Sequence, residues 1–237
     1  MKDEDRSVLI TGASRGLGRA LLEHYHSLGW QVLPLVRDAA VAEQLAAELE
    51  GCMPIVGDVV QEEVGSAISE TLTELERLDV LINNAGIPGK AVYIAEVTAA
   101  EVKALFCTHC LGALRCVKAA LPFMQHGKRI IVNVTSRFGS TARYAAGVYS
   151  DRSISYSYRI AKASQNMLTV SLAQELGPRG FVVCGVHPGR LKTASGASDA
   201  DTEPDEAATR LAAFIDRIDS TVNGHCFDLL NNETMEW

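Results

Sequence analysis

Tyr158 and Lys162, four positions apart within "YSYRIAK", have the residue types and the spacing for proton transfer. Residues at i and i+4 of a helix lie on the same face. A free phenol has a pKa of about 10, and an adjacent ammonium favours the phenolate. Tyr158 would then exchange a proton closer to neutral pH. The same pattern also occurs as an ordinary helical pair, and the motif alone does not separate the two.

A hydroxyl that could work with this pair ends the β-branched stretch "RIIVNVTS" at 129–136. The carboxyl end of a parallel strand faces the ligand crevice of its sheet. Ser136 could there hydrogen-bond a carbonyl oxygen and the alkoxide that it becomes. Capping of the strand end is the alternative role, and Thr135, Ser140 and Ser153 are competing hydroxyls that spacing does not exclude.

A glycine-rich turn, "TGASRGLG" at 11–18, separates the strand-like run "SVLI" from the helix-like run "RALLEHYHSLG". Such a turn gathers unpaired N–H groups and the positive end of a helix dipole, which suits a phosphate. The spacing of Gly12, Gly16 and Gly18 matches neither G-x-G-x-x-G nor the P-loop of nucleoside triphosphatases. A tight turn without a ligand is therefore the alternative for this octapeptide.

The ribose preference of such a site is usually set at the end of the second strand, which here reads "LPLVRD". Val36 cannot accept a hydrogen bond from a 2′-hydroxyl. Arg37, and Arg15 inside the glycine turn, could pair with a 2′-phosphate, so the sequence favours NADP(H) over NAD(H). The alternative is that both arginines are solvated surface residues, with Asp38 adjacent.

The elements that would position these residues alternate along the chain. Continuous apolar runs typical of buried parallel strands are "SVLIT", "QVLPLV", "MPIVGD", "VLINN", "RIIVNVTS", "FVVCGVH" and "HCFDLL". Between the first six lie five stretches with helical apolar spacing, at 19–29, 39–51, 62–78, 99–124 and 156–177. This alternation predicts an α/β fold, a doubly wound parallel sheet with helices on both faces, forming a single domain over 1–237. The polar stretch at 194–208 is expected to be a mobile loop next to the substrate.

Composition narrows the class of protein. The 237 residues carry a net charge of −7, which disfavours nucleic acid and acidic membrane surfaces as main partners. The start "MKDEDRSVLI" has no apolar core, and no uncharged run is long enough to span a bilayer, so we expect a cytoplasmic protein. The six cysteines are expected to be reduced core thiols. Three of them, Cys107, Cys110 and Cys116, flank His109, but no second ligand cluster accompanies them, so no metal is predicted.

Taken together, "TGASRGLG", "LINNAG" at 81–86, Ser136, "YSYRIAK" and "HPGRLKT" at 187–193 resemble the short-chain dehydrogenase/reductase family over essentially the whole chain. Within that family, the stretch from "YSYRIAK" to "LAQEL", the following "VHPGRLKT" and the ending "FDLLNNETMEW" are similar to the C-factor and sniffer-type carbonyl reductase branch. The resemblance implies a Rossmann-like dinucleotide-binding catalytic domain that reduces a ketone or aldehyde with NADP(H). It also implies a homodimer or homotetramer through the helices at 101–124 and 155–176, although this branch contains monomers as well.

The resemblance also implies residue roles. Tyr158 would be the general acid and base, Lys162 would lower its pKa and hold the nicotinamide ribose, and Ser136 would orient the carbonyl. The cofactor would contact the glycine turn, the ends of three strands and the segment after the sixth strand, at Gly12, Ser14, Arg15, Gly16, Leu17, Gly18, Arg37, Asp58, Val59, Asn84, Ala85, Gly86, Pro188, Gly189, Leu191 and Thr193.

Two departures from the family pattern stand out. The family's "F-x-V-N-x-x-G" aligns with "FCTHCLG" at 106–112, so His109 replaces the fourth active-site residue, an asparagine that supports a water chain to the lysine. His109 could preserve that relay through its backbone carbonyl, weaken the enzyme, or rewire the relay with a titrating imidazole. The long stretch 137–155 is the second departure, and it is either a surface loop or a wall of the substrate site. The residues concerned are Arg137, Phe138, Arg143 and Tyr144.

The sequence leaves three functions open. Carbonyl reduction is the main prediction, and a basic rim that includes Arg190 would favour a carboxylate or phosphate substrate. A cofactor-binding signalling or scaffold protein with slow turnover is the second. A dehydratase or epimerase that retains its cofactor is the third, and net consumption of NADPH separates reduction from both.

Overall fold

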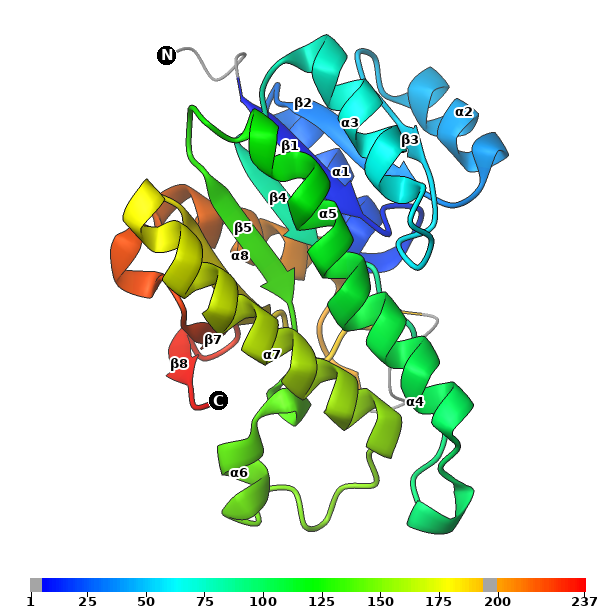
Figure 1. Ribbon diagram of the computed structural model, residues 1–237, viewed down its shortest axis with the longest axis vertical. Coiled ribbons are helices and arrows are strands. Elements are labelled where there is room, and N and C mark those ends of the chain that lie inside the picture. The colour runs from blue at the N-terminus through cyan, green and yellow to red at the C-terminus, as the bar shows by residue number, and fades with distance from the viewer. Residues whose placement is uncertain (1–5, 194–199) are drawn as a thin grey trace.

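One eight-stranded sheet, in the order β3-β2-β1-β4-β5-β6-β7-β8, forms the centre of the computed structural model, which describes residues 6–193 and 200–237 (Figure 1). Every neighbouring pair is parallel except β7 and β8. The strands are β1 Ser7–Thr11, β2 Gln31–Val36, β3 Ile55–Val56, β4 Val80–Asn83, β5 Ile130–Val134, β6 Val182–His187, β7 Cys226–Asp228 and β8 Glu233–Met235. The strand order changes direction between β1 and β4, which is the switch point of a doubly wound sheet. The predicted fold class is confirmed.

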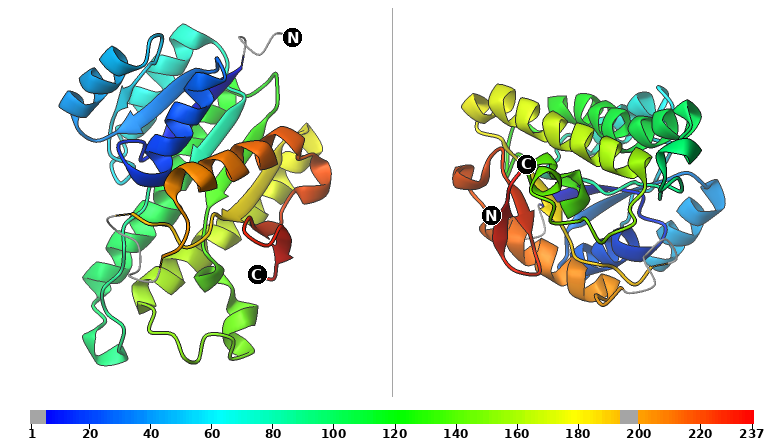
Figure 2. Two further views of the ribbon diagram at one scale, coloured as in Figure 1. Left: turned by 180° about the vertical axis from the view of Figure 1, so that it is seen from behind. Right: turned by 90° about the horizontal axis from the view of Figure 1, so that it is seen from below.

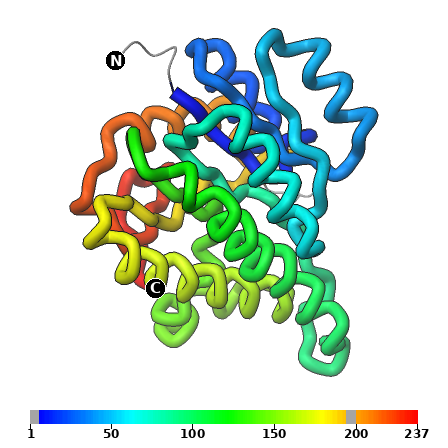
Figure 3. The backbone as a smooth tube through the Cα atoms, turned by 45° about the horizontal axis from the view of Figure 1, so that its top comes forward, coloured from blue at the N-terminus to red at the C-terminus, as the bar shows by residue number. Residues whose placement is uncertain are grey.

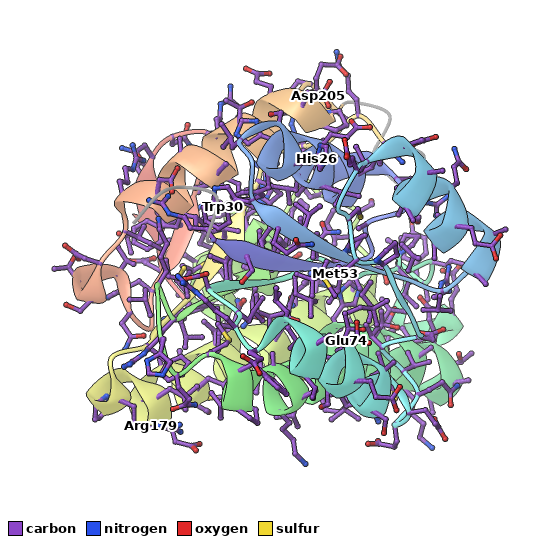
Figure 4. All side chains as sticks on the ribbon, turned by 90° about the horizontal axis from the view of Figure 1, so that it is seen from above. His26, Trp30, Met53, Glu74, Arg179 and Asp205 are labelled. Carbon is purple, nitrogen blue, oxygen red and sulfur yellow. The ribbon has the colours of Figure 1, made fainter. Side chains whose placement is uncertain are left out.

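Helices cover both faces of the sheet (Figure 2). One face carries α1 Gly16–Ser27, α2 Ala39–Glu48 and α8 Pro204–Arg217, and the other carries α3 Val64–Leu75, α4 Ala99–Phe106, α5 Gly112–Ala120 and α7 Tyr156–Leu176. The short helix α6 Thr141–Ala145 lies beyond the carboxyl end of β5. Seen from above, Asp205 on α8 and Glu74 on α3 lie on opposite sides of the strands (Figure 4).

Alternation along the central strands produces the two cores. Val8 and Ile10 of β1 pack into the cluster under α1 and α8, whereas Leu9 packs into the cluster under α3, α5 and α7. Successive side chains of a strand point to opposite faces, so a run that is apolar at every position is buried on both. All three residues are fully buried. The continuous apolar runs therefore serve two cores at once.

Two elements differ from the sequence prediction. The stretch 194–208 was expected to be one loop, but Thr202 forms a bridge with Leu191, and Pro204 begins α8; residues 194–199 lie outside the described residues. Proline at the first helical position and acidic residues in the first turn favour a helix start. The alanines and larger apolar residues of 207–215 then supply a buried stripe. The antiparallel edge strand β8 was also missed, because "ETM" has no apolar run.

The predicted helix at 99–124 contains an interruption. Between α4 and α5, the segment η3 Cys107–Leu111 is a π-helical turn, in which the N–H of Gly112 donates to the carbonyl of Cys107. The chain nevertheless continues as one rod (Figure 3). By length and composition alone, Ala99–Phe123 could cross a membrane, but half of its most apolar stretch is buried, with α4 against α7 and α5 against α3. We therefore interpret it as a core helix.

The six cysteines are free thiols, four of them buried. Burial raises the pKa of Cys116 to about 12 and that of Cys184 to about 12, which keeps both thiols protonated and inert. Within residues 6–193 and 200–237, no three His, Cys, Asp or Glu side chains gather in a way that could hold a metal ion.

Candidate active site

Two adjoining cavities open at the carboxyl ends of the strands. The first, named here the Ser136 cavity, has a volume of about 490 Å³ and is lined by Ser136, Tyr158, Lys162 and His109. The second, the glycine-turn groove, has a volume of about 950 Å³ and is lined by residues of the turn 12–18. They share lining residues, so a single elongated ligand can occupy both. Every residue predicted for catalysis or cofactor contact lines one or both cavities.

The glycine turn has the backbone geometry of an anion cradle. Gly12 and Gly16 have φ of 68° and 57°, a left-handed conformation that favours glycine. A Cβ at Gly18 would lie 2.3 Å from the carbonyl oxygen of Gly12, so a larger residue would push the turn open. Helix α1 starts here without a side-chain cap, which leaves its first N–H groups directed at the groove. These features fit a dinucleotide pyrophosphate.

The turn is held in place by the end of β4. Thr11 Oγ1 accepts hydrogen bonds from the N–H groups of Asn84 and Ala85, at 3.0 and 2.9 Å. The Asn84 side-chain amide in turn donates to the carbonyl of Thr11 at 2.9 Å. These bonds join the first strand to "NAG" across the switch point. They fix the glycine turn relative to the segment that follows β4, and both line the glycine-turn groove.

A polar ladder fixes β5 against α7 and so sets Ser136 opposite Tyr158. Asn133 Nδ2 donates to Thr169 Oγ1 at 2.8 Å, and Thr135 Oγ1 donates to Asn166 Oδ1 at 2.6 Å. All four side chains are buried, where such bonds are costly to lose. At the start of α7, Ser155 accepts from the N–H of Tyr158 and caps the helix.

The Tyr158 phenol lies beside the Ser136 hydroxyl in the Ser136 cavity, where the two can share a hydrogen bond. Burial raises the pKa of the Tyr158 phenol above its ordinary value, and the bond with Ser136 partly opposes this rise. Lys162 is not among the groups that shift this pKa here, so its lowering effect stays a prediction. The reason is geometric, because the Lys162 ammonium lies 5.8 Å from the centre of the phenol ring and is bonded elsewhere.

The Lys162 ammonium is buried and donates to the carbonyl of Val134 at 2.8 Å and to Gln165 Oε1 at 2.9 Å. Burial lowers the pKa of Lys162 to about 7. No carboxylate lines this cavity in the described part of the chain, so no negative charge there offsets the loss of hydration. The lysine is thus held close to its titration point.

This lowered pKa predicts a pH-dependent stability. The unfolded chain keeps the Lys162 proton up to a pH of about 10, whereas the folded protein releases it near 7. Since the unfolded state binds more protons between these values, the folded state gains stability as pH rises, by up to about 1.4 kcal/mol per unit. Lys162→Met lacks this contribution. Urea unfolding of both proteins at several pH values from neutral to about 9 gives their free energies of unfolding. The value for the wild type should rise relative to that of the variant as pH increases. An equal pH dependence in the two proteins would contradict the lowered pKa of Lys162.

His109 presents a neutral imidazole to the Ser136 cavity. Its Nε2 lies 2.9 Å from the carbonyl oxygen and 3.4 Å from the amide nitrogen of Ile87, and the shorter contact favours the proton on Nε2. Burial lowers the pKa of His109 to about 3, and the nearby Lys162 acts in the same direction. The ring stands edge-on to Tyr158, with centroids 5.6 Å apart. Of the three roles left open by the sequence, a titrating imidazole is the one this environment disfavours.

The remaining predicted residues lie in four places: the glycine-turn groove, the start of α2, the wall at 137–155 and the set of competing hydroxyls. Arg15, Arg37, Asp58 and Val59 line the glycine-turn groove, where Arg37 is exposed and 3.9 Å from Asp58. Asp38 caps α2 by accepting from the N–H of Ala40. In the wall proposed from 137–155, Arg137 and Phe138 reach the Ser136 cavity, whereas Arg143 and Tyr144 do not line it. Among the competing hydroxyls, Thr135 and Ser153 line the cavity and Ser140 caps α6.

Sequence reasoning missed three contributors. Gln165 accepts from Lys162, and its i+3 spacing on the same helix could have identified it. His187 and Arg152 also line the Ser136 cavity. The ring of His187 is buried and its Nε2 has no hydrogen-bond partner among the described residues. His187 opens the stretch "HPGRLKT", which could have identified it, whereas no local pattern marks Arg152.

Comparison with known proteins agrees with this geometry. Residues 6–204 match the family model described as short chain dehydrogenase. C-signal of Myxococcus xanthus is 35% identical over 157 residues, which cover 66% of this chain and 91% of that protein. L-fucose dehydrogenase of Mus musculus is 31% identical over 205 residues, covering 86% and 72%.

Solved structures extend the likeness to the whole fold. The NADPH-bound carbonyl reductase from chicken fatty liver superposes with a TM-score of 0.87 at 26% identity, covering 98% of this chain and 99% of that one. Carbonyl reductase Sniffer of D. melanogaster gives 0.86 at 25% identity, with the same coverage. The glycine turn, the switch-point groove and these matches together show that the chain belongs to the short-chain dehydrogenase/reductase family of oxidoreductases.

Proposed function

We propose that this protein is an NADP(H)-dependent reductase that converts a ketone or aldehyde into an alcohol. The observation that carries the proposal is the hydroxyl pair of Ser136 and Tyr158, which stands beside Lys162 in a cavity continuous with the glycine-turn groove. The bound nicotinamide cofactor would supply the hydride. The carbonyl reductases among the similar structures support the same reaction class.

In this mechanism, the chain's own residues bind the carbonyl and move one proton. Ser136 donates a hydrogen bond to the carbonyl oxygen and keeps donating as negative charge develops there. Tyr158 gives its phenolic proton to that oxygen, which completes the alcohol. Lys162, whose ammonium lies 5.8 Å from the centre of the Tyr158 ring, would stabilise the resulting phenolate. Glycine-turn N–H groups would hold the pyrophosphate.

The test is oxidation of NADPH, and separately of NADH, with a panel of aldehydes, ketones, diketones and keto acids. Steady consumption of NADPH by at least one carbonyl supports the proposal. Binding of NADPH without consumption on any carbonyl would refute it and favour a cofactor-binding protein with little turnover or a retained-cofactor reaction.

Arg37→Gln tests the cofactor preference. Arg37 lines the groove with an exposed guanidinium, where it can pair with a 2′-phosphate. Losing one charge-assisted bond should weaken NADPH binding about tenfold and leave NADH nearly unchanged. KM values for both cofactors measure the effect. Arg217→Gln, an equal change of charge outside both cavities, is the control, and an equal loss for both cofactors in Arg37→Gln would argue against a 2′-phosphate contact.

His109→Asn tests the departure from the family pattern. The imidazole is neutral and bonded to Ile87, and the carbonyl of residue 109 belongs to the π-helical turn whichever side chain it bears. We therefore expect the rate to change by no more than a factor of a few. A change of orders of magnitude in kcat would show that the imidazole itself takes part.

We also propose a cytoplasmic homodimer or homotetramer that uses the helices at 101–124 and 155–176. Ile160 and Met167 are exposed on α7, 44% and 65% respectively, and seven residues apart they share one face. Sedimentation of the wild type and Met167→Lys would test it, since a charge in such an interface should shift the protein towards monomer.

A further inference from the structure

All charged side chains in the described lining of the Ser136 cavity are cationic. Lys162, Arg137, Arg152 and Arg190 line it, and among residues 6–193 and 200–237 no aspartate or glutamate does. The chain as a whole carries seven more acidic than basic residues. The cavity therefore has the opposite charge balance from the rest of the molecule, which favours anionic ligands.

Arg137 is the most informative of these cations. It directly follows Ser136 and begins the short helix η5 Arg137–Gly139. Its guanidinium lies 5.2 Å from the centre of the Phe138 ring, which orients it. Its Nε is buried, and the described part of the chain offers the side chain no hydrogen bond or ion pair. By contrast, Arg190 on the other side of the cavity is paired with Asp201.

Arg137 as a whole is only partly buried, but its Nε is buried without a hydrogen-bond partner among the described residues. An anionic ligand that accepts a hydrogen bond from this nitrogen would supply the missing partner. The surrounding groups do not supply it. His187 faces Arg137, but burial lowers its pKa below its ordinary value, so its ring is neutral near pH 7. Asp228 interacts with His187 and is not within ion-pair distance of Arg137.

We infer that the carbonyl substrate carries a carboxylate or phosphate group that pairs with Arg137. The inference rests on the proposed function and adds the substrate class. Because Arg137 and Ser136 line the same cavity, one substrate molecule can present its carbonyl to Ser136 and its anionic group to Arg137. A planar guanidinium can hold either group through two parallel hydrogen bonds.

The first experiment compares matched substrates with NADPH. Succinate semialdehyde is compared with its methyl ester, and dihydroxyacetone phosphate with dihydroxyacetone. We expect kcat/KM to favour the anionic member of at least one pair by about tenfold to a hundredfold. The pair that shows the preference distinguishes a carboxylate from a phosphate. Equal rates within both pairs would overturn the inference while leaving carbonyl reduction standing.

The second experiment assigns the preference to Arg137. Arg137→Gln should lower the ratio of anionic to neutral kcat/KM about tenfold or more, and Arg137→Lys should restore part of it. Arg179→Gln removes the same charge outside both cavities, in the turn Gly177–Arg179 that precedes the amino end of β6 (Figure 4), and should leave the ratio unchanged. An unchanged ratio in Arg137→Gln would overturn the assignment.

A binding measurement separates this inference from the reaction. Calorimetric titration of the protein with NADP⁺ present should detect benzoate or phenyl phosphate, but not benzamide, and Arg137→Gln should abolish the signal. Equal binding of benzoate, phenyl phosphate and benzamide, or no binding of any, would overturn the inference. Anion binding without turnover on any carbonyl would instead refute the proposed reduction and keep the anion site.

Discussion

Tyr158→Phe is expected to lower the rate of NADPH-dependent carbonyl reduction by on the order of 10²–10⁴. The substitution removes one oxygen, the proton donor, and leaves the ring in place. Ser136 would then lose its hydroxyl partner but keep its position, since Phe138 donates its N–H to Ser136 Oγ at 3.2 Å. The initial rate with saturating NADPH measures the loss. NADPH affinity, followed by fluorescence, should remain within a factor of a few.

Tyr156→Phe is the matched control. Tyr156 stands two residues earlier, its ring lies 4.0 Å from the guanidinium carbon of Arg159, and it does not line the Ser136 cavity. It should retain nearly full activity. A Tyr158→Phe protein that binds NADPH and reduces carbonyls at the wild-type rate would remove Tyr158 from the role of acid.

Asp79→Ala is expected to destabilise the folded protein by about 3–5 kcal/mol, the cost of leaving a buried ion pair half made. Asp79 is fully buried at the amino end of β4. Its carboxylate accepts two bonds from Arg77, at 2.9 and 2.8 Å, and one each from the N–H groups of Ser7 and Lys128, both at 3.1 Å. Alanine would orphan both N–H groups where strands β1 and β5 begin. Urea unfolding measures the loss.

Glu23→Ala provides the comparison for this prediction. Glu23 pairs with Arg19 one helical turn away, and its side chain is 49% exposed. Exposed i, i+4 pairs contribute only about 0.3–0.5 kcal/mol. Similar losses in the two variants would mean that burial does not distinguish these ion pairs. Measuring kcat of the folded Asp79→Ala protein would also show whether the end of the sheet opposite the active site affects stability alone or catalysis as well.

The strands of the sheet could be predicted because buried parallel strands are continuous apolar runs, which are visible in a single sequence. All seven apolar runs became strands, although the third shrank to Ile55–Val56. The helix at 204–217 was not predicted because its first residues belong to the polar stretch 194–208, whose composition favours a loop. Its own signals, Pro204 at the first position and the buried stripe from Ala207 to Ile215, begin only where that polar stretch ends.

The sequence predicted many of the residues that line the two cavities, but not their pKa values. Spacing brought Tyr158 and Lys162 to one face, and the structure places both in the Ser136 cavity. The direction of the Tyr158 pKa could not be predicted, because it depends on how deeply the phenol is buried and on where Lys162 finds its acceptors. Those acceptors come from β5 and from a glutamine that no motif includes. Burial and long-range pairing are properties of the assembled fold.

The π-helical turn at Cys107–Leu111 allows the two halves of the long helix to pack against different helices. One extra residue in a turn shifts the angular phase of everything after it, since successive α-helical residues are spaced by about 100°. Ahead of the turn the helix packs on α7, and beyond it on α3. The extra residue sets the rotation of α5 relative to α4. Deleting one residue from this segment would rotate the side chains of α5 away from α3. The length of this segment is therefore constrained as tightly as its composition.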